Sequence, residues 1–101
     1  MKKYLVVSKG LPQAKAFERA AKEYVVKNNI SVEWIFAKEA DYLDLVKSEN
    51  VDVVVISPEV IISENKIKAE LDMINVNYVS VKPSDFGLRR LDKIMPILEQ
   101  F

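Results

Sequence analysis

Short apolar runs alternate with segments of helical periodicity along this chain, and that alternation restricts the fold more than any other feature. Residues 4–7 and 52–56 form runs that are almost continuously apolar. Residues 30–37 and 77–81 instead alternate apolar and polar side chains. Continuous runs are typical of strands covered on both faces, and alternating runs of strands with one solvated face. The sequence therefore predicts two central strands and two edge strands.

A helix is predicted after each strand, because apolar residues recur there at three- and four-residue spacing. The predicted helices cover residues 13–28, 41–48 and 63–74, and a last segment after Pro83 that carries Leu88, Leu91, Ile94, Met95 and Leu98. Pro12 suits the first turn of the first helix, and Asn28 and Asn29 suit its end. Pro96 lacks a backbone donor, so we expect a kink or a restart in the last helix.

Strands that alternate with helices form a parallel sheet with helices on both faces, joined by right-handed crossovers. With the apolar runs in the centre, the strand order is 2-1-3-4. The predicted fold class is α/β, a three-layer α/β/α flavodoxin-like arrangement. Since 101 residues leave no room for a second core, we expect residues 1–101 to form a single domain.

This strand order predicts where a ligand would bind. In open α/β sheets, ligands bind beyond the carboxyl ends of the strands where the order reverses, here between the first and third strands. The residues of the first loop are Ser8, Lys9, Gly10, Leu11, Pro12 and Gln13, and those of the second loop are Ser57, Pro58 and Glu59. We take these two loops as the candidate site.

The chemistry available in the loops leaves alternatives open. Lys9 and Gly10 precede a helix whose free amides favour an anion, or they form a plain turn. Ser8 has no histidine to activate it, so we expect it to bind its own loop. Glu59 and Asp85 could form a catalytic carboxylate pair, but we expect solvated loop acids.

Val60, Ile61 and Ile62 follow the second loop and have two readings. They form either the inner face at the start of the third helix or a patch on which a partner docks.

Composition excludes several classes of protein. The chain has no cysteine and no histidine, so disulfides, thiol chemistry and conventional zinc or copper sites are excluded, and we expect no metal and no cofactor. The 15 basic and 15 acidic residues balance, which argues against binding to nucleic acid or an anionic membrane surface. No apolar run approaches the ~20 residues of a membrane span, and the chain starts with a strand rather than a signal sequence. We expect a cytoplasmic monomer.

Three segments resemble a known family. Residues 3–11, residues 52–60, and residues 79–81 leading to Phe86 and Gly87 are similar to the B component (enzyme IIB) of the lactose/cellobiose class. This class belongs to the bacterial phosphoenolpyruvate-dependent sugar phosphotransferase system. The resemblance implies a cytoplasmic phosphocarrier. Its cysteine takes a phosphoryl group from a histidine of the A component and passes it to sugar on the membrane C component.

The reactive loop departs from the family pattern Cys-Ser-Ala-Gly-Met-Ser-Thr-Ser. Val7 occupies the position of the cysteine, while Ser8 and Gly10 match. Further along, Pro12 removes a backbone donor, Gln13 and Ala14 replace hydroxyl residues, and Leu11 stands at the methionine. In the second loop Pro58 matches and Glu59 replaces the usual glutamine.

We therefore interpret the chain as a degenerate IIB-like domain that is non-catalytic for phosphoryl transfer and acts by binding or regulation. Its partners would be the A and C components, with A docking around residues 9–13 and 60–62. The alternative is a functional phosphocarrier whose acceptor lies elsewhere or whose cysteine has been replaced. A receiver domain would need acids at Ser8, Lys9 and Ser57, and a flavin site would need a hydroxyl-rich first loop.

Overall fold

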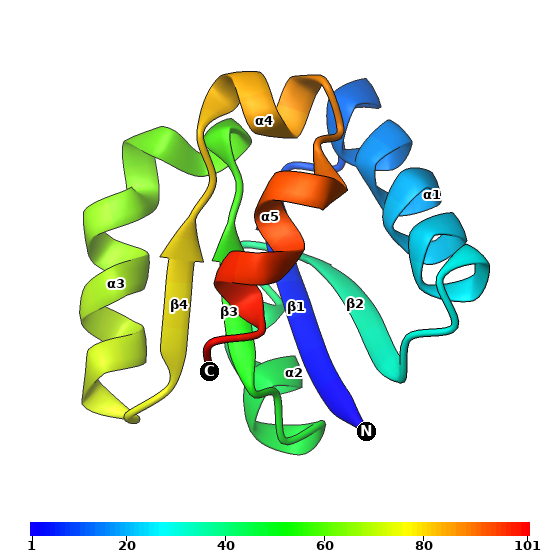
Figure 1. Cartoon of the computed structure of the whole chain (residues 1–101). Coiled ribbons are helices and arrows are strands. Elements are labelled where there is room, and N and C mark those ends of the chain that lie inside the picture. The colour runs from blue at the N-terminus through cyan, green and yellow to red at the C-terminus, as the bar shows by residue number, and fades with distance from the viewer.

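A parallel sheet forms the middle layer of the computed structural model, which describes all residues from Met1 to Phe101 (Figure 1). Its strands are β1 (Lys2–Ser8), β2 (Val32–Lys38), β3 (Val53–Ile56) and β4 (Asn77–Ser80). The order is β2-β1-β3-β4, and every neighbouring pair is parallel. The predicted fold class and strand order are confirmed, so β1 and β3 lie side by side in the centre.

Helices cover both faces of the sheet. They are α1 (Pro12–Lys27), α2 (Tyr42–Ser48), the 3-10 helix η1 (Pro58–Ser63), α3 (Glu64–Met73), α4 (Pro83–Gly87) and α5 (Leu91–Leu98). The helices α1, α4 and α5 contribute to the core on one face, and α2, η1 and α3 to the core on the other (Figure 1). None of these helices combines the length and the apolar character needed to cross a bilayer.

Successive side chains of β1 enter two separate cores. Tyr4 and Val6 pack on the side of α1, α4 and α5, while Leu5 and Val7 pack on the side of α2 and α3. Because both cores are apolar, a central strand here reads as a continuous apolar run.

An aromatic cluster fills the α1 side of the sheet. Trp34 of β2 packs edge-to-face on Tyr4 and Phe17, with ring centroids 5.3 and 6.1 Å apart. It is only 7% exposed, and its Nε1 has no hydrogen-bond partner. Such edge-to-face pairs stabilise the fold by more than the apolar area that they bury.

The first four α-helices end in the same way, with a residue in the left-handed region just after the C-cap. These residues are Asn29, Asn50, Asn75 and Arg89, with φ of 55°, 53°, 55° and 53°. In each case the next amide donates to the carbonyl five residues earlier, as Val76 does to Leu71 at 3.1 Å. This is the Schellman motif, and asparagine is the usual substitute for glycine in it.

The last helical segment differs from the prediction. It is divided into α4 and α5 at residues 88–90, so Leu88 is an exposed link residue rather than part of a continuous helix. The break follows from the left-handed conformation of Arg89, not from Pro96, which lies inside α5 without ending it. Pro96 is exposed, so water can reach the carbonyl that its missing N–H would have bound.

Candidate functional site

The two predicted loops meet at the carboxyl edge of the sheet. The amide of Ser57 donates to the carbonyl of Val7 at 3.3 Å, so β1 and the segment after β3 remain paired up to the point where both loops begin. The loop from Ser8 to α1 therefore lies beside the turn that starts η1. The structure brings the candidate residues of both loops together.

Glu59 connects the two loops. Its Oε1 accepts hydrogen bonds from the amides of Lys9 (3.0 Å) and Leu11 (3.3 Å). Its Oε2 accepts one from the amide of Ala14 at 3.1 Å. The expectation of a solvated loop acid is therefore wrong for Glu59, whose carboxylate fills the position where the loop amides converge. None of its hydrogen bonds involves Asp85, which lies in the first turn of α4.

The carboxylate also caps α1. Leu11 is the N-cap residue and offers no side-chain cap, and the first turn of α1 contains no acidic residue. Ala14 is the third residue of that helix, and its amide has no partner within the helix. Glu59 satisfies this amide and places a negative charge at the positive end of the helix dipole.

Ser8 and Gly10 shape the first loop from within. Ser8 is 4% exposed, and its Oγ accepts a hydrogen bond from the amide of Gly10 at 3.2 Å, which confirms that Ser8 binds its own loop. Gly10 adopts φ 70°, a conformation that favours glycine. A Cβ at Gly10 would also lie 3.2 Å from Cε of Lys38. Both the backbone conformation and the lack of space therefore favour glycine at this position.

Val7 lies where the family resemblance implies the reactive cysteine. Its side chain is completely buried in the core on the α2 and α3 side, together with Leu5 and Ile56. Ser8 is the next residue, and side chains of a strand alternate between its faces. An atom that reaches the interior of the loop would therefore come from position 8 rather than position 7.

The other loop residues form the rim of the site. Lys9, Leu11, Pro12 and Gln13 are exposed. Pro12 lies in the first turn of α1 as predicted, and the helix begins with it, one residue before the predicted start. The side-chain amide of Gln13 lies near Gly87 of α4, with its nitrogen 3.4 Å from the place a Cβ would occupy there. These residues are available to a partner.

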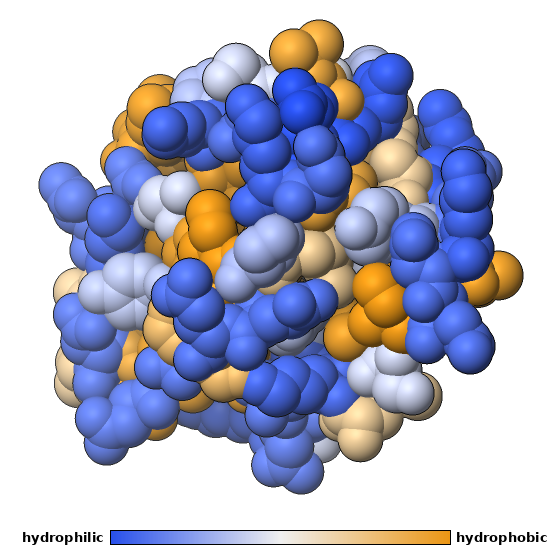
Figure 2. All heavy atoms as spheres, in the orientation of Figure 1, coloured by the Kyte–Doolittle hydropathy of each residue, from blue (hydrophilic) through white to orange (hydrophobic).

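The second loop presents an apolar edge next to Glu59. Pro58 begins η1, and the side chain of Ser57 is buried with no hydrogen-bond partner for its Oγ. Val60 points into the core, whereas Ile61 and Ile62 are 63% and 91% exposed. Apolar patches in Figure 2, one of them over the junction of η1 and α3, are separated by hydrophilic residues. Val60 is thus the inner face of the segment, and the two isoleucines are an exposed surface.

A pocket of about 180 Å³ opens on the other side of the first loop, between α1 and β2. Its lining includes Lys15 and Lys38, which the sequence did not single out. The sequence pattern does not predict that these lysines lie near each other, because Lys15 belongs to α1 and Lys38 to β2. No group of three or more histidine, cysteine or acidic side chains lies close enough to hold a metal ion.

The chain was compared with family models, curated proteins and solved structures. No family model and no curated protein matches the sequence. The structure is similar to the lactose-specific IIB component domain of the phosphoenolpyruvate:carbohydrate phosphotransferase system from Streptococcus pneumoniae, with a TM-score of 0.78 and 16% sequence identity. The match covers 99% of this chain and 97% of that domain. This chain has the fold of a phosphotransferase-system IIB domain. At 16% identity the similarity shows a shared fold. For the fold, it confirms the resemblance to enzyme IIB inferred from the sequence.

Proposed function

We propose that this chain is a IIB-like domain that does not relay phosphoryl groups and acts by binding a component of a sugar phosphotransferase system. The observation that supports this most directly is the carboxylate of Glu59, which accepts the amide hydrogen bonds of Lys9, Leu11 and Ala14. A phosphoryl group bound at these amides would have to displace a negative charge already hydrogen-bonded there.

The nucleophiles available to the site support the same proposal. The chain has neither cysteine nor histidine. Ser8 is the one hydroxyl inside the first loop, and a serine needs a neighbouring base to act as a nucleophile. A phosphoserine at this position would be an ordinary ester without the transfer potential of a thiophosphate. Even if Ser8 were phosphorylated, it could therefore not pass the phosphoryl group on to a sugar.

The exposed apolar residues beside the site supply a binding surface. Leu11 (49% exposed) belongs to the loop that Glu59 holds in place, and Ile61 and Ile62 follow Glu59 in η1. We call these three residues the docking surface. Exposed apolar groups next to a polar rim are typical of partner contacts. The proposed partners are the A and C components, met in the cytoplasm by a monomeric domain.

The decisive experiment incubates the protein with a phosphorylated A component and measures its intact mass. We expect no added phosphoryl group, while a cysteine-containing lactose-specific IIB domain, run in parallel, gains one. A phosphoryl group on any residue of the unmodified chain would overturn the proposal and support the phosphocarrier alternative.

Cysteine variants extend this test to the scaffold. In Ser8→Cys with Glu59→Gln, the sulfur enters the loop and the amides lose their charged occupant, so we expect phosphorylation to be measurable. Val7→Cys with the same Glu59→Gln change is the matched control: its sulfur would lie in the core, so we expect no modification. If the Val7→Cys double variant is phosphorylated and the Ser8→Cys double variant is not, the loop geometry described above does not govern the chemistry.

A further inference from the structure

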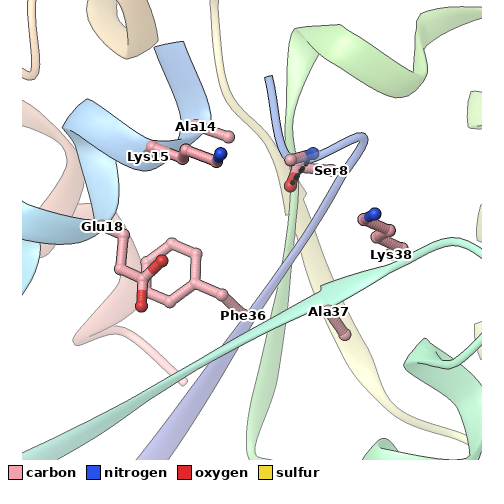
Figure 3. Close-up of a pocket in the computed structure, with 8 residues that line it drawn as sticks. Ser8, Ala14, Lys15, Glu18, Phe36, Ala37 and Lys38 are labelled. Carbon is pink, nitrogen blue, oxygen red and sulfur yellow. Dashed lines mark hydrogen bonds between the residues drawn. The ribbon is translucent and has the colours of Figure 1, made fainter. Parts of the chain in front are cut away.

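The pocket between α1 and β2 contains converging hydrogen-bond donors. It is lined by Ser8, Gly10, Ala14, Lys15, Glu18, Phe36, Ala37 and Lys38. Figure 3 shows Lys15, from α1, and Lys38, from β2, extending toward Ser8 from opposite sides. Gly10 carries no side chain, which lets the stem of Lys38 lie close over the loop.

These donors have no acceptor within the chain. The Oγ of Ser8 accepts a hydrogen bond from Gly10 but donates to no group, although the residue is more than nine-tenths buried. Neither Lys15 nor Lys38 has a carboxylate within salt-bridge distance. Glu18 is the one acid in the lining, and it is bound to Lys22 at 2.8 Å.

A pocket with free donors and free positive charge fits a ligand that has only acceptors and carries negative charge. We propose that this pocket binds a phosphate group, either inorganic phosphate or the terminal group of a small phosphomonoester, through Lys15, Lys38 and the hydroxyl of Ser8. A tetrahedral oxyanion can accept from three directions at once, as this arrangement requires.

This pocket adjoins the amides that Glu59 occupies, and Ala14 borders both, but the proposed ligand groups are different. Those amides belong to Lys9, Leu11 and Ala14, whereas the proposed ligands are side chains on the β2 side of the loop. The inference therefore does not depend on the proposed function. It would hold for a chain that carries phosphoryl groups and for one that does not.

The test is a titration of the ¹⁵N-labelled protein with inorganic phosphate at constant ionic strength, followed by amide chemical shifts, and repeated with glycerol 2-phosphate. We expect saturable shifts centred on Ser8, Gly10 and Lys38. Replacing Lys15 or Lys38 by alanine removes a charged hydrogen bond and should weaken binding by about tenfold each. Lys27→Ala is the matched control, because Lys27 lies in the last turn of α1 outside this pocket, and it should leave affinity unchanged.

The two phosphate sources are distinguished by comparing their affinities in the same protein. Tighter binding of glycerol 2-phosphate identifies a phosphomonoester site, and equal or tighter binding of inorganic phosphate identifies a site for the free anion; either supports the proposal. The proposal is overturned if the shifts do not saturate or if the lysine variants bind as the unmodified protein does. It is also overturned if the shifts are confined to Lys9 and Leu11, since phosphate would then be displacing Glu59.

Discussion

Glu59 caps α1 from outside the helix, whereas helices are usually capped by residues at their own start. Helix α1 has no side-chain cap and no acid in its first turn, and a carboxylate from the turn after β3 supplies both. The three hydrogen bonds join residues separated by 45 to 50 positions in the chain. The same contact therefore stabilises a helix end and ties together the two loops of the candidate site.

Removing this carboxylate should measurably destabilise the fold. Glu59→Ala is expected to lower the free energy of unfolding by about 1–3 kcal/mol, since it leaves three amides without their charged acceptor. Glu59→Gln keeps one good acceptor oxygen and should lose less. Urea unfolding of both variants measures the difference.

The control for this comparison is Glu23→Gln on the exposed face of α1, where Glu23 takes part in no side-chain hydrogen bond or ion pair of the chain. It should change stability by less than about 0.5 kcal/mol. Equal stabilities of Glu59→Ala and the unmodified protein would show that water replaces the carboxylate at no cost.

At the scale of elements, one partly buried hydrogen bond joins α2 to α3. The hydroxyl of Tyr42 donates to Oε1 of Glu70 at 2.7 Å, and the Tyr42 side chain is almost completely buried. Burial, followed by the hydrogen bond to Glu70, raises the pKa of Tyr42 well above its ordinary value of 10.0. The neutral phenol is therefore favoured in the folded protein.

The raised pKa of Tyr42 makes the stability of the fold depend on pH. Because the folded chain holds this proton more tightly than the unfolded chain, the stabilisation is complete below pH 10 and is lost as the pH rises above it. We expect the free energy of unfolding to fall above pH 10 and to fall less steeply in Tyr42→Phe, which cannot ionise. Urea titrations at increasing pH provide the measurement. Burial also raises the pKa of Tyr4, so part of the fall should remain in the variant, and an unchanged slope would contradict this assignment.

The link between α4 and α5 offers a separate test of backbone strain. Arg89 adopts φ 53°, the conformation that asparagine adopts at the ends of α1, α2 and α3. A non-glycine residue there costs about 1–2 kcal/mol, so Arg89→Gly should raise stability by about 1 kcal/mol after the entropic cost of glycine. Thermal unfolding measures the gain, with Asn75→Gly as the comparison expected to change stability less. A loss of stability in Arg89→Gly would show that its side chain outweighs the strain.

At the scale of the whole molecule, the docking surface predicts a change in binding without a change in folding. Ile62 is 91% exposed, so Ile62→Glu removes little buried area and should leave stability within about 0.5 kcal/mol. Under the proposed function it should weaken association with the A component, measured by titration calorimetry. Met73→Glu, which alters another highly exposed apolar residue (84%) at the far end of α3, serves as the control and should bind normally. Equal binding by the Ile62 and Met73 variants would place the contact elsewhere.

The sheet could be predicted because its signals are local. The apolar runs around Leu5 and Val54 mark strands buried on both faces, and this decides which strands are central. The break at Arg89 could not be predicted, because no glycine or asparagine marks it as Asn29, Asn50 and Asn75 mark the other helix ends.

The proximity of the two candidate loops was predicted, but the contacts between them were not, for a related physical reason. Strand order places the loops of Ser8 and Glu59 together, but it does not say which amides a carboxylate reaches. The capping of α1 by Glu59 and the pairing of Lys15 with Lys38 across one pocket both depend on the packing of distant segments. Side-chain roles of this kind carry no periodic signal in the sequence.

The position of Trp34 gives the chain a built-in optical reporter. It is the one tryptophan in the sequence, it is enclosed by Tyr4 and Phe17, and its ring stacks on Phe36, with centroids 6.2 Å apart. Phe36 in turn lines the pocket beside Lys15 and Lys38. The fluorescence emission of Trp34 should shift to longer wavelength when the aromatic cluster opens. Unfolding of the native chain can therefore be followed without any attached dye.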